Sequence, residues 1–141
     1  MRAAQLRLEE AQRPLVLVTG VFDLLHAGHM RLLFQAREKA EHGTLVVGVN
    51  SDRWCAEHKR VPVMNFAERV TALGYMPWDK LVEIDTQAEL RDLINRLRPD
   101  LHVLGTDHLG YESKYPWMRK MFVRSGGMHT TEIIKRVRGL V

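Results

Sequence analysis

The chain has 141 residues, of which 45% are hydrophobic and 27% charged, and its formal net charge is +4. This length fits one domain, and this composition excludes an intrinsically disordered or fibrous protein. Cys55 is the single cysteine, so an internal disulfide is excluded and a reducing, cytoplasmic location is expected. The apolar run 15–18 is far shorter than the roughly 20 residues of a membrane span. Residues 1–13 are polar and charged, so we expect an N-terminal extension there and neither a signal peptide nor a membrane anchor.

The basic side chains are concentrated toward the C-terminus. Residues 114–141 carry seven Lys or Arg side chains against Glu132 alone. Such a segment can face a nucleic acid, an anionic membrane or a phosphorylated small molecule, or it can be a solvated basic helix. Because the sequence lacks the run of about five consecutive like charges typical of nucleic-acid-binding arms, we expect no nucleic-acid partner.

Short apolar runs alternate with amphipathic stretches along the chain. The runs predict five strands, at 15–18, 45–49, 81–84, 101–104 and 121–123. The stretches between them predict helices at 28–41 and 51–57, and further helices that begin after Asn65, Thr86 and His129. Strands that alternate with helices in this way predict an α/β domain over 14–141, with a doubly wound parallel sheet of about five strands.

Two of the predicted helix starts carry a capping pattern. Asn65 and Thr86 each stand three residues before a glutamate, Glu68 and Glu89. The cap side chain accepts a hydrogen bond from the first turn, and the glutamate accepts one from the backbone N–H of the cap. We therefore expect both glutamates to bond back to their own caps.

The turn after the first predicted strand is where such a sheet binds its ligands. It reads TGVFDLLHAGHM over residues 19–30 and matches neither of the common glycine-rich phosphate loops. His26, Gly28 and His29 stand at a helix start, where free N–H groups favour an anion, and an adjacent phosphate favours protonated imidazoles. By spacing alone, the histidines could instead be a structural pair or part of a divalent-metal site, although a tetrahedral site needs further ligands.

Five separated motifs together resemble the nucleotidyltransferase superfamily that carries the HxGH motif. They are GVFDLLHAGH at 20–29, VGVNSD at 47–52, Lys59 with Glu68-Arg69, LGTD at 104–107 and RSGGMHTTEI at 124–133. The resemblance covers about residues 14–138 and is strongest to the cytidylyltransferase-like branch, typified by glycerol-3-phosphate cytidylyltransferases. It implies a Rossmann-like nucleotidyltransferase domain that transfers a nucleoside monophosphate from a nucleoside triphosphate to a small phosphorylated acceptor, such as glycerol 3-phosphate, and releases pyrophosphate.

The resemblance also implies a role for each matching residue. The nucleotide-binding set would be Val21, Phe22, Asp23, His26, Gly28, His29, Asp107, Arg124, Thr130 and Thr131. The catalytic set would be His26, His29, Lys59 and Arg124, and the acceptor phosphate would meet Lys59 and Arg69. Tyr111 and Trp117 are further candidates for acceptor contact. No protein metal ligand is implied, so Mg²⁺ would be held through the phosphates of the nucleotide.

Lys59 lies in an irregular stretch, 58–64, that contains Pro62. A long cationic side chain on such a segment can move between solvent and phosphates. We therefore expect this stretch to be less ordered without ligand and to close over the bound substrates.

Three departures from the family pattern leave the acceptor open. Val21 stands in place of Thr, His129 in place of Ser, and Glu132 in place of Lys. The LGTD motif favours CTP, while ATP, as used by the ADP-heptose-forming, FAD-forming and pantetheine-phosphate enzymes, is the alternative. A second alternative is a non-catalytic module that binds a nucleotide or nucleic acid. Because members of the family often form homodimers, we also expect a homodimer.

Overall fold

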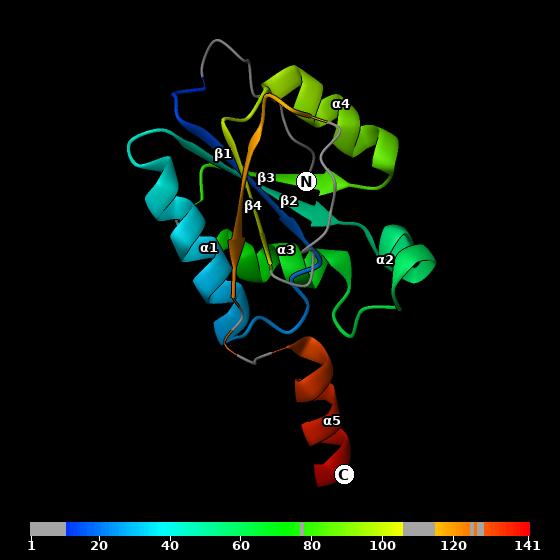
Figure 1. The fold of residues 1–141 in the computed structure, drawn as a ribbon. Helices are drawn as coiled ribbons and strands as arrows, with labels where there is room; N and C mark the ends of the chain where they lie inside the picture. Colours follow the sequence, from blue (N-terminus) through cyan, green and yellow to red (C-terminus); the bar gives the residue numbers. More distant parts are fainter. Residues whose placement is uncertain (1–10, 77, 106–114, 125, 127–128) are drawn as a thin grey trace.

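The computed structural model describes residues 11–76, 78–105, 115–124, 126 and 129–141. Its sheet has five parallel strands in the order β3-β2-β1-β4-β5 (Figure 1). They are β1 (Leu15–Gly20), β2 (Thr44–Asn50), β3 (Lys80–Ile84), β4 (Leu101–Gly105) and β5 (Arg119–Val123). This arrangement confirms the predicted Rossmann-like, doubly wound α/β fold.

The helices fall where the sequence predicts them. They are α1 (Ala27–Ala40), α2 (Asp52–His58), α3 (Phe66–Gly74), α4 (Gln87–Leu97) and α5 (Thr130–Leu140). In Figure 1, α1 and α4 lie on opposite sides of the sheet, and α5 leads away from the rest of the molecule. No residue of α5 is buried. None of the described helices is long and apolar enough to cross a membrane.

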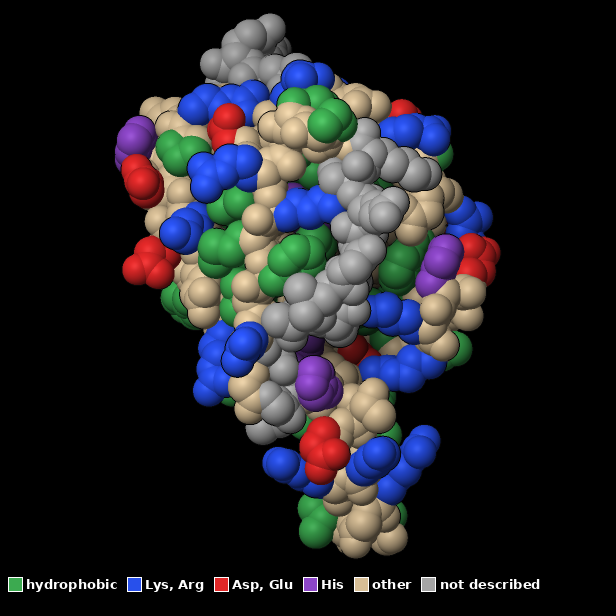
Figure 2. All heavy atoms as spheres, viewed as in Figure 1, with side chains coloured by type: hydrophobic (Ala, Val, Ile, Leu, Met, Phe, Trp, Pro, Cys, Tyr) green, Lys and Arg blue, Asp and Glu red, His purple; other side chains and the backbone are tan. Residues whose placement is uncertain are grey.

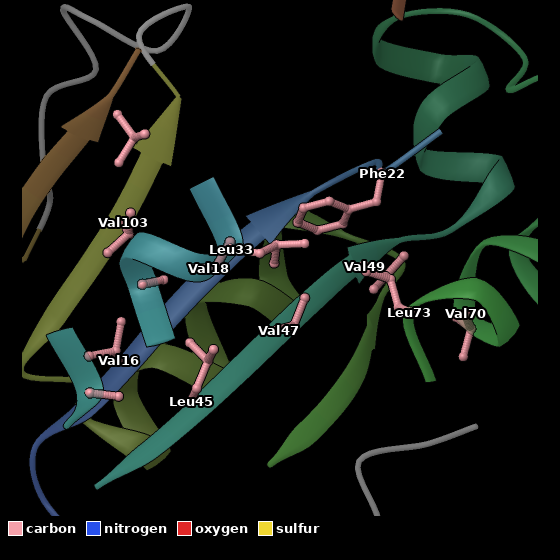
Figure 3. Close-up of a cluster of buried hydrophobic side chains, with 13 residues drawn as sticks. Val16, Val18, Phe22, Leu33, Leu45, Val47, Val49, Val70, Leu73 and Val103 are labelled. Carbon is pink, nitrogen blue, oxygen red and sulfur yellow. The ribbon is translucent and has the colours of Figure 1, made fainter. Parts of the chain in front are cut away.

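Alternate residues of β1 divide the core into two layers. Val16 and Val18 pack with Leu33 of α1 on one face (Figure 3). Leu15 and Leu17 pack on the other face, in the cluster that includes the apolar side of α4. Both faces of β1 are therefore buried, which is the usual condition of a central strand in a doubly wound sheet.

One of the two predicted capping boxes forms. The Asn65 side chain accepts from Glu68 N–H, and the Glu68 side chain accepts from Asn65 N–H. Thr86 likewise caps its helix by accepting from Glu89 N–H at 3.0 Å. The Glu89 carboxylate, however, accepts from the N–H of Asp85 at 2.8 Å, one residue before the cap. The prediction of a reciprocal bond was therefore wrong for Glu89.

The order of the strands places a crevice beside β1. From β1 the chain moves outward through β2 and β3 on one side, and then returns to add β4 and β5 on the other. The carboxyl ends of β1 and β4 flank the point where this order reverses, which is where ligands bind in open α/β sheets.

Candidate active site

A cavity of about 430 Å³ lies at the carboxyl ends of β1 and β4. The turn after β1, the end of α2 and the first turn of α5 all contribute to its lining. Among the predicted site residues, Val21, Phe22, Asp23, His26, Gly28, His29, Lys59, Thr130 and Thr131 line it. The structure thus brings together residues more than 100 positions apart, such as His26 and Thr130, which are directly hydrogen-bonded.

The floor of the cavity is built by an unusual backbone at Phe22. Its φ is 56°, a left-handed conformation that non-glycine residues rarely adopt. This turn folds the Phe22 ring back beneath Gly20, where a Cβ would lie only 3.1 Å from the ring. The ring is 2% exposed and lies 5.7 Å from the His29 ring, centroid to centroid. Strained backbone of this kind is concentrated at functional sites.

His26 and His29 form a stacked pair with ring centroids 3.8 Å apart. His26 Nδ1 accepts from Gly28 N–H at 3.0 Å, and His29 Nδ1 accepts from His26 N–H at 3.3 Å. Because each Nδ1 accepts a backbone proton, it carries none, and the proton of each neutral ring is on Nε2. Each imidazole therefore has one donor, Nε2–H, that the helix start does not use.

The surroundings of both histidines favour the neutral form of the ring. Burial lowers the pKa of His29 to about 4; the neighbouring His26 also lowers it, whereas Asp23 raises it. Burial likewise lowers the pKa of His26, and His129 adds to this effect. The sequence predicts protonated rings beside a bound phosphate, so binding of a polyanion would have to raise these pKa values.

Asp23 fastens the segment that follows α2 to the turn after β1. Its carboxylate is 1% exposed and accepts from Val63 N–H at 2.8 Å, Met64 N–H at 2.9 Å and Arg60 at 3.1 Å. Burial raises the pKa of Asp23, but the hydrogen bonds from Met64, Val63 and Arg60 outweigh it and hold the pKa below 3.8. Asp23 lines the cavity, but its carboxylate already accepts hydrogen bonds from other residues of the protein.

Lys59 immediately follows α2 and lines the cavity with an exposed side chain. The sequence predicts a poorly ordered stretch at 58–64, but the structure binds Arg60, Val63 and Met64 to Asp23. These hydrogen bonds fix Arg60, Val63 and Met64 to the turn after β1 in this structure. Closure of the whole stretch stays a prediction.

Arg69 is placed differently from the acceptor-binding role that the resemblance implies. Its side chain is 0% exposed and is not part of the cavity lining. The guanidinium donates to the carbonyls of Val21, Asn50 and Met64 at 2.6, 2.9 and 3.0 Å, and to the Asp52 carboxylate at 2.8 Å. In this geometry Arg69 joins the ends of β1, β2 and the start of α3, and direct contact with an acceptor phosphate has no support.

Other predicted residues lie away from the cavity or outside the described chain. Arg124 follows β5, is exposed and does not line the cavity. Asp107 and Tyr111 lie outside the described residues. Trp117 does not line this cavity; it precedes β5, and the Arg98 guanidinium covers its ring at 4.0 Å. The predicted roles of Arg124 and Asp107 stay predictions.

Residues 17–136 match the family model described as cytidylyltransferase-like. The chain belongs to this family of nucleotidyltransferases. Bifunctional protein HldE of Campylobacter fetus is 32% identical over 139 residues, which cover 95% of this chain and 30% of that protein. Ethanolamine-phosphate cytidylyltransferase of Dictyostelium discoideum is 36% identical over 131 residues, which cover 86% and 36%. This cytidylyltransferase-like chain thus spans about a third of the length of these relatives.

The fold comparison agrees with the family. The crystal structure of the lipopolysaccharide core biosynthesis protein from Thermoplasma volcanium superimposes with a TM-score of 0.65 at 23% identity. The superposition covers 78% of this chain and 93% of that one. At this identity the likeness establishes the shared fold and nothing further about the ligand.

Several residues that line the cavity of this cytidylyltransferase-like domain were not assigned a site role from the sequence, among them Arg60, Cys55 and His129. Arg60 lines the cavity and pairs with Asp23. Its position in the sequence, directly after Lys59, could have identified it as a candidate. Cys55 also lines the cavity, and burial raises the pKa of its thiol, so it is a neutral wall residue. His129, noted only as a departure from the family pattern, also lines the cavity, next to Thr130.

The described residues contain no group of three or more His, Cys, Asp or Glu side chains that could hold a metal ion. The carboxylate that does line the cavity, Asp23, already accepts three hydrogen bonds. Magnesium prefers several oxygen ligands in octahedral geometry. In the described part of the chain, the protein thus offers no ready magnesium site, and the oxygens of a nucleotide would have to supply most ligands.

Proposed function

We propose that this cytidylyltransferase-like domain transfers a nucleoside monophosphate from a nucleoside triphosphate, preferably CTP, to a small phosphomonoester, and releases pyrophosphate. The observation that carries this proposal is the convergence around one cavity of the stacked His26–His29 pair with Lys59, Arg60 and Thr131. Hydrogen-bond donors and cations from three separate segments face a space at the switch point of the sheet, which suits a polyphosphate.

The reaction needs no strong base. An oxygen of the acceptor phosphate attacks the α-phosphorus, the bond to the oxygen that bridges to the β-phosphate breaks, and pyrophosphate leaves with that oxygen. A phosphomonoester with a second pKa near 6 is already mostly dianionic at pH 7. The protein must therefore position two polyanions and stabilise the charge that develops between them.

The histidine pair supplies preorganised donors for that charge. His26 and His29 each present a neutral Nε2–H, because backbone N–H groups occupy both Nδ1 atoms. Donors held in place before the reaction stabilise developing charge without reorganisation. A bound triphosphate raises the pKa of the rings and strengthens these hydrogen bonds.

Lys59 and Arg60 serve the acceptor side of the cavity. Both follow α2 and line the cavity, and Arg60 is 39% exposed although it is paired with Asp23. Two adjacent cations on one side favour an anionic acceptor over a neutral alcohol. Magnesium would enter with the phosphates of the nucleotide and lower the repulsion between the two substrates.

Three observations favour CTP as the nucleotide. They are the family description, a relative named as an ethanolamine-phosphate cytidylyltransferase, and the LGTD motif at 104–107. ATP is the second candidate. ATP stays a candidate because the HxGH motif is shared with the branch of the superfamily that uses ATP.

The test is pyrophosphate release with Mg²⁺ and each of CTP, ATP, GTP and UTP, each combined with glycerol phosphate, ethanolamine phosphate and sugar phosphates. We expect one nucleotide to support acceptor-dependent release, with CTP the most active. If only ATP supports pyrophosphate release, the proposed nucleotide is wrong, but the proposed reaction, nucleotidyl transfer, still holds. If no nucleotide supports release while binding to duplex DNA or RNA falls with salt, the domain is a binding module.

A homodimer also belongs to this proposal, because family members often pair. Sedimentation equilibrium of the whole chain tests it. A mass of twice 16.3 kDa is expected, and a monomer at high protein concentration would contradict it.

A further inference from the structure

The Thr130 hydroxyl joins two segments that are more than 100 residues away in sequence. It donates to the backbone carbonyl of Asp23 at 3.1 Å. It also lies 3.3 Å from His26 Nε2. Thr130 is the first residue of α5, and Asp23 and His26 belong to the turn between β1 and α1.

The direction of each hydrogen bond follows from the donors available. A hydroxyl has one proton, and Thr130 gives it to the Asp23 carbonyl, which can only accept. Toward His26 the hydroxyl must therefore accept. His26 Nδ1 already accepts from Gly28 N–H, so the ring proton is on Nε2 and points at Thr130. His26 Nε2–H therefore donates to the Thr130 hydroxyl, and the Thr130 hydroxyl donates to the Asp23 carbonyl.

We propose that Thr130 is a positioning residue, whose hydroxyl holds the His26 ring with its Nε2–H at the cavity wall before a nucleotide binds. This differs from the direct phosphate contact that the family resemblance implies for Thr130. Both residues line the cavity, so a phosphate oxygen that enters beside Thr130 accepts the same N–H with little rotation of the ring. The expected effect of Thr130 on catalysis rests on the proposed nucleotidyl transfer. The expected protonation and hydrogen bonding of the His26 ring do not depend on that reaction.

The attachment of α5 gives this hydrogen bond a second consequence. No residue of α5 is buried, and the helix leads away from the body of the molecule (Figure 1). In Figure 2, Lys and Arg side chains lie on both sides of α5, and histidine side chains gather where it joins the body. The bonds of Thr130 to His26 and Asp23 therefore also help to place Thr131 and His129 at the cavity.

The test compares Thr130→Val with Thr130→Ser in the full chain. Valine keeps the shape of threonine and removes the hydroxyl, while serine keeps the hydroxyl. We expect Thr130→Val to lower kcat about tenfold, the value of one hydrogen bond, with the KM for the nucleotide within twofold. Thr130→Ser should keep most of the activity. Thr71→Val is the matched control, because Thr71 donates to Ala67 on the exposed side of α3 and should leave kcat unchanged.

NMR of the His26 ring distinguishes this positioning role from a merely structural one. In protein labelled with ¹⁵N-histidine, we expect the His26 Nε2–H proton to be visible in the wild type and in Thr130→Ser. It should exchange with water too fast to be seen in Thr130→Val, and His26→Gln assigns the signal.

Two results would overturn the inference. One is an Nε2–H signal that persists unchanged in Thr130→Val. The other is a variant with unchanged kcat and a raised KM for the nucleotide, which would make Thr130 a phosphate ligand. If the wild type shows no transfer at all, the proposed function fails, while the state of the His26 ring still decides the role of Thr130.

Discussion

Two layers of polar residues surround the cavity, and they differ in what they bind. The inner layer, Asp23 and Arg69, is buried, and its charged groups are bonded to the backbone and to other side chains of the same protein. The rim, Lys59, Thr130 and Thr131, lines the cavity and is at least partly exposed. Both layers lie within motifs shared with the family, but in the inner layer the charged groups are already bound by the chain itself.

This difference teaches that a shared motif does not by itself mark substrate contact. A buried charge is costly unless it is fully paired, so Asp23 and Arg69 must be held by the chain. By fixing the turn after β1 and the residues after α2, they place the groups that line the cavity. The histidine pair lies between the layers and is half-buried, in surroundings that favour the neutral form of both rings, and the Nε2–H of His26 is held by the Thr130 hydroxyl.

The strongest test of the inner layer is Arg69→Ala. Removing this side chain leaves the carbonyls of Val21, Asn50 and Met64 without their donor. A buried acceptor left without a donor costs about 1–3 kcal/mol, so the loss of three such bonds should lower the free energy of unfolding in urea by several kcal/mol. Arg53→Ala is the matched control, because Arg53 is 60% exposed and pairs with Asp85 at the surface; it should cost less than about 1 kcal/mol.

The same variant can also show that Arg69 contacts the substrate instead. An unchanged unfolding midpoint together with a raised KM for the acceptor would place Arg69 at the substrate. The division into two layers would then be wrong for this residue.

His29→Ala should lower turnover about 10²–10³-fold, or roughly 2.7–4 kcal/mol in the barrier, because a preorganised donor to the transition state is lost. Its effect on the melting temperature should be much smaller. The measurement is pyrophosphate release beside thermal unfolding of the same samples. His42→Ala, at a 78% exposed side chain after α1, provides the control. Parallel losses of melting temperature and activity would assign His29 to the inner layer.

The neutral state of His29 predicts a loss of stability in acid. Its pKa is about 4 in the folded protein and 6.5 as the ordinary value. Between these values the unfolded chain binds the additional proton, so the free energy of unfolding falls as the pH drops from 6.5 to 4. The difference of the two pKa values corresponds to about 3 kcal/mol at pH 4. Urea titrations across this range should show a shallower pH dependence in His29→Gln; equal slopes in both proteins would contradict a neutral buried ring.

Lys59→Ala tests the rim and should lower turnover less than His29→Ala does. Loss of a cation between two phosphates should reduce turnover about ten- to a hundredfold, while nucleotide affinity changes only a few-fold. Titration calorimetry and turnover on the same variant separate the two quantities. Lys80→Ala, an exposed residue at the start of β3, controls for loss of charge. Wild-type turnover in Lys59→Ala would make Lys59 a solvated surface residue.

The sequence predicts the fold well because its strands and helix starts carry local signals. The apolar runs at Leu15 and Leu45 begin buried strands, and Asn65 caps α3 as its pattern indicates. Parallel strands then bring their carboxyl ends together by geometry, so the place of the site also follows. His26, Gly28 and His29 line the cavity as a consequence.

The division between layers could not be predicted, because it depends on contacts between distant segments. The partners of Arg69 at Val21 and Asn50 are 48 and 19 residues away. The bond of Thr130 to Asp23 spans 107 residues. Motif matching assigns such side chains to substrate, and only the folded arrangement shows which donors the chain itself already uses.

The most direct test of the central claim follows the label of the nucleotide. Incubation with Mg²⁺, a reactive phosphomonoester and CTP labelled at the α-phosphate should move the label into the acceptor, in a diester joined through two phosphates. With CTP labelled at the γ-phosphate, the label should appear in pyrophosphate. Label from the γ-phosphate in the acceptor would indicate a kinase, and label released as orthophosphate from either substrate would indicate a hydrolase. Either result would contradict nucleotidyl transfer at this cavity.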